Sequence, residues 1–234
     1  MSSLIVILIV LFYSLSGLTG SIHSVCPSVG SAASFAVLAG SGVSNAGISY
    51  VFGNLAVYPS IAVTGFSVTV GIDGYLNGTQ QLGTPTALEA KLNVTNAYNK
   101  CMGAPVSVDY SGTDLGGLTL TKGVYKFGGA AALTGILTLK GKGVFIFQIA
   151  SALTINEGSQ IILTRGATAG CIFWQVGSSA TLGLNSQFSG IILAYTSISV
   201  ATGVHVSGSL FAQNGAVTLI SDIIHVRPRC MACH

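Results

Sequence analysis

The last five residues of the chain have the spacing of a chemical motif. Cys230, Cys233 and His234 fit the pattern C-x-x-C-H, in which two thiols attach haem and the histidine ligates the iron. A haem must also be enclosed by protein, and here no chain follows the histidine. We therefore expect a disulfide or a frayed tail at this position, and we expect no cofactor.

The other residue types that perform catalysis are scattered. The carboxylates are Asp73, Glu89, Asp109, Asp114, Glu157 and Asp222. They do not recur at a spacing that would bring two together, as glycoside hydrolysis requires. The histidines (His23, His205, His225 and His234) form no zinc-type cluster, and the Gly-x-Ser-x-Gly elbow of hydrolases is missing. We expect neither a catalytic site nor a metal site, so the chain is not predicted to be an enzyme.

The cysteine content favours an oxidising compartment. There are five cysteines, so at least one is free or pairs between chains. Cys26 lies near one end of the chain, and Cys230 and Cys233 lie near the other. A bridge between Cys26 and this C-terminal pair is our working hypothesis, although connectivity does not follow from sequence.

The composition at first suggests a membrane protein. Of 234 residues, 50% are hydrophobic and 6% are charged, and mean hydropathy is +0.73. However, a membrane-spanning helix needs about 20 consecutive apolar residues, and the only long apolar run is 4–13. The net charge of +3 comes without a basic cluster, which argues against nucleic-acid binding.

The first segment has the layout of a secretory signal peptide. The apolar run 4–13 is followed by small residues, which predicts a leader over 1–24 and one mature domain over 25–234. A retained anchor is the alternative. Asn77 and Asn93 begin N-x-[ST] sequons, so both are candidate glycosylation sites. We expect a secreted, extracellular protein with no membrane contact after the leader is removed.

The body of the chain reads as stacked short strands. Apolar and small polar residues alternate in runs of four to eight between glycine-containing turns, as in half-buried strands. Four runs can be aligned as rungs of a solenoid: 148–155, 175–182, 194–200 and 212–219. The alignment places Leu153, Ala180, Ile198 and Val217 in an inward column. Its outward columns are Thr154, Thr181, Ser199, Thr218 and, beside them, Ala152, Ser179, Ser197, Ala216.

One segment departs from the strand pattern. Thr86 and Glu89 have the spacing of a capping box, and a helical period then continues to about Met102. The predicted buried face contains Ala87, Val94, Ala97, Tyr98 and Cys101, widened by Leu88 and Leu92. We expect this helix, 86–102, to pack along one side of the solenoid.

Eight segments resemble a known family. They are FAVLAGSGVSN (35–45), GNLAVYP (53–59), VTGF (63–66), GVYKF (123–127), FIFQI (145–149), FWQV (173–176), QFSGIILA (187–194) and GSLFAQ (208–213). In this order they are similar to the microbial secreted ice-binding protein family. The resemblance covers nearly all of 28–226.

The resemblance implies an all-β-dominated fold, a right-handed parallel β-solenoid of triangular section with coils discontinuous in sequence and the helix alongside. It also implies a monomer whose partner is the ice surface, bound through one flat face of small and hydroxyl residues. Carried onto this chain, the ice-binding candidates are Ser41, Ser44, Ser60, Ala62, Ala152, Thr154, Ser179, Thr181, Ser197, Ser199, Asn214, Ala216 and Thr218.

Two alternatives use the same architecture. A carbohydrate-active β-helix would need clustered carboxylates or basic residues, which the sequence does not provide. A surface adhesin or matrix module needs neither, and serine and threonine are also ordinary solvent-side strand residues. The sequence leaves this second alternative open.

Overall fold

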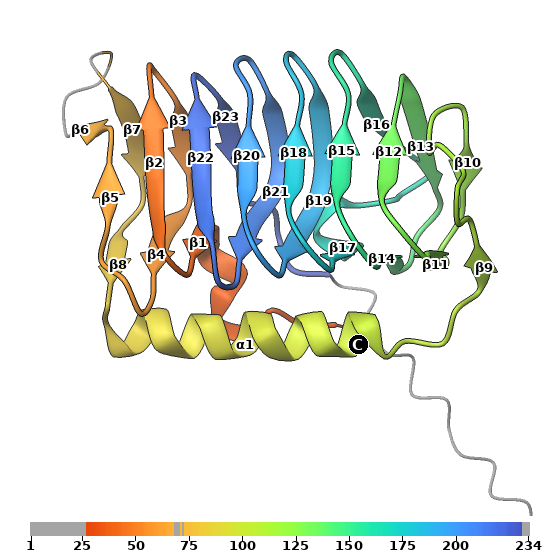
Figure 1. The fold of residues 1–234 in the computed structure, drawn as a ribbon, viewed down its shortest axis with the longest axis horizontal. Coiled ribbons are helices and arrows are strands. Elements are labelled where there is room, and N and C mark those ends of the chain that lie inside the picture. The colour runs from red at the N-terminus through yellow and green to blue at the C-terminus, as the bar shows by residue number, and fades with distance from the viewer. Residues whose placement is uncertain (1–26, 68–70, 72, 231–234) are drawn as a thin grey trace, which may run out of the picture.

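The computed structural model describes residues 27–67, 71 and 73–230. In this part of the chain, short parallel strands stack into a solenoid with one long helix alongside (Figure 1). The predicted fold class is confirmed. The predicted signal peptide over 1–24 falls outside the described residues.

One side of the solenoid is a sheet of seven strands that faces the viewer in Figure 1. We call it the front sheet. In stacking order it contains β12(Ala131–Leu133), β15(Leu153–Ile155), β18(Ala180–Leu182), β20(Ile198–Val200), β22(Ala216–Ile220), β2(Gly42–Ala46) and β5(Val63–Thr64).

A second sheet of sixteen strands wraps around the other two sides. It contains β1(Phe35–Ala39), β3(Tyr50–Phe52), β4(Asn54–Val57), β6(Phe66–Ser67), β7(Gly74–Asn77), β8(Gln80–Leu82), β9(Val108–Asp109), β10(Thr119–Leu120), β11(Gly123–Phe127), β13(Ile136–Lys140), β14(Phe145–Ile149), β16(Gln160–Thr164), β17(Ile172–Val176), β19(Gln187–Ala194), β21(His205–Ala212) and β23(Ile223–His225).

The bend in this wrapped sheet depends on glycine. The first residue of β19 pairs with β16 on the rear side, whereas its second half pairs with β17 beside the helix. Between them, Gly190 pairs with Gly208 of β21, and their φ angles are +123° and +152°. A Cβ at Gly208 would lie 1.8 Å from the Gly190 carbonyl oxygen. Only glycine fits this conformation and this close approach.

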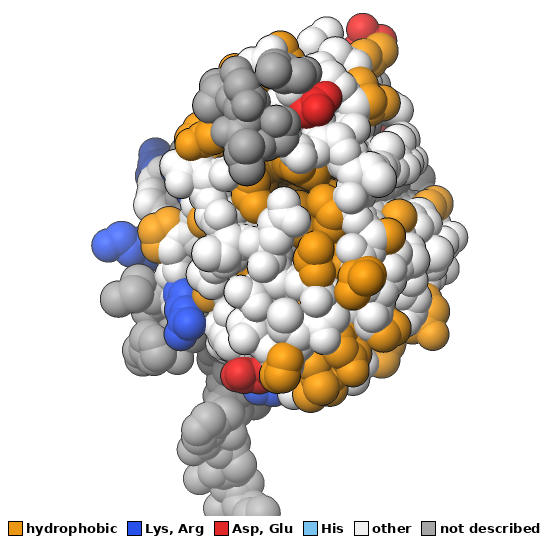
Figure 2. Space-filling view, turned by 90° about the vertical axis from the view of Figure 1, so that its left-hand side faces the viewer, with side chains coloured by type: hydrophobic (Ala, Val, Ile, Leu, Met, Phe, Trp, Pro, Cys, Tyr) orange, Lys and Arg blue, Asp and Glu red, His pale blue; other side chains and the backbone are white. Residues whose placement is uncertain are grey.

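The coils do not stack in the order of the sequence. In the front sheet, β2 from the N-terminal part lies beside β22 from the C-terminal part, and β5 is the end strand. Figure 2 looks at this end of the stack, where several hydrophobic side chains are visible. The described chain thus begins next to one end of the stack, completes that end with β5, and must then travel to the other.

Helix α1(Pro85–Met102) makes this passage along the bottom of the solenoid (Figure 1). Its 18 residues span about 27 Å at 1.5 Å per residue, or between five and six strand spacings of about 4.8 Å. The buried positions include the five predicted ones, Ala87, Val94, Ala97, Tyr98 and Cys101.

Two details of the helix differ from the prediction. The N-cap is Thr84, whose Oγ1 accepts a hydrogen bond from the Ala87 N–H at 3.2 Å, so the helix begins one residue before Thr86. Leu92 does not widen the buried face, because 55% of it is exposed.

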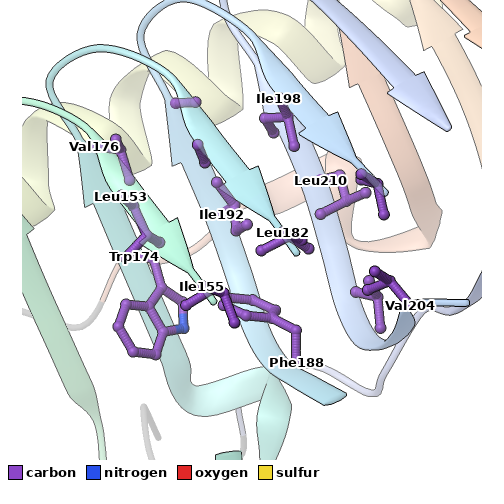
Figure 3. Packing of buried hydrophobic residues seen from close by; sticks show 14 of the residues in the cluster. Leu153, Ile155, Trp174, Val176, Leu182, Phe188, Ile192, Ile198, Val204 and Leu210 are labelled. Carbon is purple, nitrogen blue, oxygen red and sulfur yellow. The ribbon is translucent and has the colours of Figure 1, made fainter. Parts of the chain in front are cut away.

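The core between the sheets is closely packed. Figure 3 shows Leu153, Leu182 and Ile198 of the front sheet pointing toward Trp174 and Ile192 of the wrapped sheet. The ring centroids of Trp174 and Phe147 are 3.8 Å apart and their planes are 7° from parallel. The predicted inward column is buried, as all four of its members are at most 1% exposed.

A second apolar layer separates the wrapped sheet from α1. Leu38, Ala56, Phe173, Leu193 and Phe211 pack against the small residues of the helix and are 2% exposed or less. Strands on this side are buried on both faces. This explains why the sequence is so apolar although no described helix is long and apolar enough to cross a membrane.

The cysteine prediction needs correction. Cys230 is bonded to Cys171, the last residue of the short helix η2(Ala169–Cys171). A Cys26–Cys230 bridge is therefore wrong, while Cys26 and Cys233 lie outside the described residues. Cys101 is a free thiol on the buried face of α1, and burial raises its pKa.

Candidate functional site

A continuous row of hydroxyl side chains runs across the front sheet. Strand register places Thr154 beside Thr181, Thr181 beside Ser199, and Ser199 beside Thr218. The row continues into the N-terminal coils, because Thr218 pairs with Ser44 and Ser44 with Thr64. The other end of the row is Ala132, which pairs with Thr154. We call these seven residues the hydroxyl row: Ala132, Thr154, Thr181, Ser199, Thr218, Ser44 and Thr64.

A second row lies two residues earlier on each strand, so it shares the outward face. Gly42 pairs with Ala216, and the Ser197 Oγ accepts a hydrogen bond from the Ala216 N–H at 3.3 Å. The Ser179 Oγ accepts in the same way from the Ser197 N–H. We call this the small-residue row: Ala62, Gly42, Ala216, Ser197, Ser179 and Ala152.

The two rows differ in what their hydroxyls do. In the small-residue row, both serine hydroxyls accept from the backbone of the next coil and fix its position. In the hydroxyl row, Ser44 and Thr218 contact each other at 3.4 Å. The remaining hydroxyls of that row make no hydrogen bond to another described residue, and Thr64, Thr154, Thr181 and Ser199 are exposed. They are free to hold water.

The front sheet carries no charged side chain in either row. Figure 2 looks at the molecule from the end of the stack. The front sheet lies edge-on at the right, where no blue Lys or Arg side chain is visible, whereas blue side chains project from the left. Removing water from a charged side chain costs roughly several kcal/mol. A surface without charged side chains avoids this cost when it meets a ligand.

The rear side of the solenoid has a different character. Its outward row consists of bulky side chains, paired in the order Gln160, Gln187, His205, Ile223, Tyr50 and Tyr75. Phe52 and His225 stack beside this row, with ring centroids 4.2 Å apart. Side chains of such unequal length do not make a flat platform. The front sheet is thus the side of the molecule with a regular surface.

The structure places ten of the thirteen candidate residues in the two rows. The other three lie at the corner toward α1. The Ser41 N–H donates to the Gly215 carbonyl, the Ser60 Oγ accepts from the Ala62 N–H, and the Asn214 Nδ2 donates to the Tyr195 carbonyl.

Three row members are not among the residues predicted from sequence: Thr64, Gly42 and Ala132. Thr64 and Ala132 come from the end coils of the stack, and Gly42 comes from a coil that pairs across a long sequence separation. The alternation in 41–46 and 62–64 carries the signal. The register of these coils against the other coils could not be inferred from the sequence.

The structure also places the residues considered for other chemistry. No group of three or more His, Cys, Asp or Glu within metal-binding reach occurs among the described residues. Cys230 is held in a disulfide and is not available to attach haem. His234 and Cys233 lie outside the described residues.

Asp222 is the one buried carboxylate in the described part of the chain. Its Oδ1 accepts from the Val204 N–H and its Oδ2 from the Ile220 N–H, at 3.1 and 2.7 Å. Burial raises its pKa to about 6, against the opposing effect of these two hydrogen bonds. Both oxygens face the protein's own backbone, which is a structural role at a coil corner.

The two sequon asparagines differ in accessibility. Asn77 is exposed at the end of β7. Asn93 is half-buried on α1, and its Nδ2 donates to the Ser31 Oγ of η1(Gly30–Ser34) and to the Glu89 carbonyl, both at 3.0 Å. Since Nδ2 is the atom that a glycan would modify, Asn77 is the more accessible acceptor.

Comparison with protein families and curated proteins gives one consistent picture. The family model described as ice-binding-like matches residues 37–225. An ice-binding protein of Nostoc sp. (strain HG1) is 43% identical over 210 residues, covering 86% of this chain and 76% of that protein. An ice-binding protein of Colwellia sp. is 36% identical over 211 residues, covering 84% of this chain and 82% of that protein.

Solved structures agree with the sequence comparison. The crystal structure of an ice-binding protein from the Antarctic ascomycete Antarctomyces psychrotrophicus has a TM-score of 0.80 and 37% sequence identity. The match covers 86% of this chain and 98% of that one. At this coverage, the arrangement of coils and helix is shared as a whole.

Proposed function

Because the chain belongs to the ice-binding-like family, we propose that it binds ice through the front sheet. Once adsorbed, it curbs the growth and recrystallisation of ice and produces a gap between melting and freezing temperatures (thermal hysteresis). The family is not one of enzymes. The proposed ligand is the ordered water of an ice crystal.

The hydroxyl row is the single observation that carries this proposal. Parallel strands stack at about 4.8 Å, so the row repeats at one spacing over seven coils. Its outward hydroxyls can anchor water, while threonine methyls and the alanines beside them limit where that water sits. Each contact is weak, but a rigid platform makes all of them without the entropy cost of ordering itself.

The experiment tests the flatness of the front sheet with one bulky side chain. Thr181→Tyr, in the middle of the hydroxyl row, should lower thermal hysteresis severalfold because the ring holds the surface away from ice. The matched control is Gln187→Tyr, an exposed position on the rear side, which should keep full activity. Both variants should retain the melting temperature of the unmodified protein. Equal thermal hysteresis in the two variants would show that the front sheet is not the ice-binding surface.

The adhesin or matrix module remains the second candidate. Such a module uses the same solenoid. The regular hydroxyl row of the front sheet would then have no role in binding ice. Growth of a single ice crystal in the purified protein separates the two, because only an ice-binding protein produces facets and arrests growth below the melting point. A crystal that grows as a smooth disc would favour the adhesin.

We further propose that the protein is secreted through a leader over 1–24 and acts as a monomer over 25–234. The apolar run at the N-terminus, the Cys171–Cys230 disulfide and the accessible sequon at Asn77 support an extracellular location. N-terminal sequencing of the mature protein tests the leader. Peptide mapping after glycosidase treatment tests Asn77 and Asn93.

A further inference from the structure

A cavity of about 700 Å³ opens on the rear of the solenoid, away from the front sheet. Its polar lining comes from Lys142, Arg227 and Arg229 and from the hydroxyl residues Thr168, Ser189 and Ser207. None of these residues belongs to the rows described above. Three cations around one cavity are notable in a chain with nine basic residues in all.

The wall of the cavity is built by the segment 226–230, which crosses the rear side and is fixed at several points. The Arg227 Nη2 donates to the Ser207 Oγ at 3.0 Å, and Cys230 is bonded to Cys171. Gly170 lies directly under this segment, since a Cβ there would be 1.9 Å from the Pro228 carbonyl oxygen. The cavity therefore exists before any ligand arrives, which lowers the cost of binding.

Further positive charge borders the cavity. The Lys142 side chain lies over Gly166, and the Lys122 side chain lies over Gly143, one coil away. Arg165 comes directly before Gly166 and is exposed. No acidic residue lines the cavity, and these cations form no ion pair with another described residue. In Figure 2, blue Lys and Arg side chains are visible on the left flank, opposite the front sheet.

The rest of the lining narrows the class of ligand. The apolar part comes from Leu163, Ala169 and Pro228, with no aromatic side chain on which a nucleobase could stack. Serine hydroxyls and glycine backbone suit the hydroxyl groups of a sugar. We propose that this cavity binds a short stretch of an anionic polysaccharide, whose carboxylate or sulfate groups contact Lys142, Arg227 and Arg229.

Such a site would let one molecule hold ice and an extracellular polyanion at the same time, because the two surfaces lie on different sides of the solenoid. It does not depend on ice binding, so either proposal can fail alone. Charge-assisted hydrogen bonds from arginine to a carboxylate would supply most of the affinity. Added salt should weaken binding, since exposed charges are screened beyond about 10 Å at 0.1 M ionic strength.

The test is calorimetric titration of the full chain with an alginate trisaccharide, which carries three uronate groups, and with neutral maltotriose. The unmodified protein should bind the alginate trisaccharide and not maltotriose. Lys142→Gln/Arg229→Gln should weaken binding by about tenfold or more, as expected when two charged contacts are lost. Arg227 is left intact in this variant because it also holds the segment 226–230.

The matched control is Lys100→Gln/Lys126→Gln, which removes the same charge from exposed positions outside the cavity. It should bind the trisaccharide as the unmodified protein does, and both variants should keep full thermal hysteresis. The proposal is overturned if the unmodified protein does not bind the trisaccharide, if the two variants weaken equally, or if maltotriose binds equally well. Tighter binding of a single-stranded oligonucleotide or of anionic lipid vesicles would also overturn it.

Discussion

At the scale of single residues, hydroxyl groups divide into those that hold the protein together and those left to solvent. The Ser179 and Ser197 hydroxyls accept from the backbone of a neighbouring coil, whereas Thr154, Thr181 and Ser199 have no partner among the described residues. The first group of hydroxyls holds neighbouring coils in position, and the second group is available to bind water. Sequence alone assigns both groups to the same face but does not separate their roles.

Asp222 offers a prediction about pH. Burial raises the pKa of its carboxyl from 3.8 to about 6, so the folded state holds the proton more tightly than the unfolded state does. The free energy of unfolding should therefore fall as pH rises from about 4 to about 6, and level off above that. Asp222→Asn should flatten this slope, as measured by chemical denaturation at a series of pH values.

Comparing the slopes of unfolding free energy against pH separates the effect of titration from the loss of stability that the substitution itself causes. An asparagine amide would face one of the two N–H donors now bound by the carboxylate, so the variant should be less stable at every pH. The exposed Asp73→Asn variant is the control and should leave the slope unchanged. A slope that survives in Asp222→Asn would assign the pH dependence to another group.

The sequence predicted the middle of the hydroxyl row and lost its ends, for a physical reason. Thr154, Thr181, Ser199 and Thr218 lie on coils that follow one another in sequence, so similar rungs could be aligned. Ser44 contacts Thr218 across 174 residues, and nothing local encodes that register, so Ser44 was a candidate only through the family resemblance and its neighbour Thr64 was missed. Ser41 and Ser60 were placed in the site from resemblance and lie instead at the corner.

At the scale of elements, α1 is placed by its small residues and by its cap. Ala87, Ala90 and Ala97 are completely buried, which lets the helix axis approach a sheet already covered with Phe173 and Phe211. The capping box in the sequence pointed to Thr86, but the chain enters the helix through Pro85. Proline is favoured in the first turn, because its missing N–H has no intrahelical partner there.

The cap yields a prediction with a built-in control. Thr84→Ala removes the hydroxyl that accepts from the Ala87 N–H, and should cost about 1 kcal/mol of unfolding free energy, the usual size for a threonine cap. Thr86→Ala, two residues away on the exposed side of the first turn, should change stability by less than about 0.5 kcal/mol. Chemical denaturation measures both. A larger loss in Thr86→Ala would restore the capping box predicted from sequence.

At the scale of the whole molecule, the fold turns a discontinuous chain into a continuous surface. The front sheet orders its strands β12, β15, β18, β20, β22, β2, β5, so the N-terminal coils extend the row begun by the C-terminal ones. A solenoid could be predicted from the alternation of short strands, because period and turn residues are local. The stacking order could not be predicted in this way, because it depends on which end of the stack the N-terminal coils pack against.

This continuity makes the position of a defect in the hydroxyl row matter. If ice contacts the row as one plane, a bulky side chain in its middle lifts the whole surface, whereas one at its end leaves the other coils in contact. Thr64→Tyr, on the end strand β5, should therefore lose much less thermal hysteresis than Thr181→Tyr, near the centre. Both threonines are exposed, so the substitutions are equivalent apart from position. Hysteresis measured at equal protein concentration decides it, and an equal loss at the two positions would mean that ice is held at separate sites rather than by one plane.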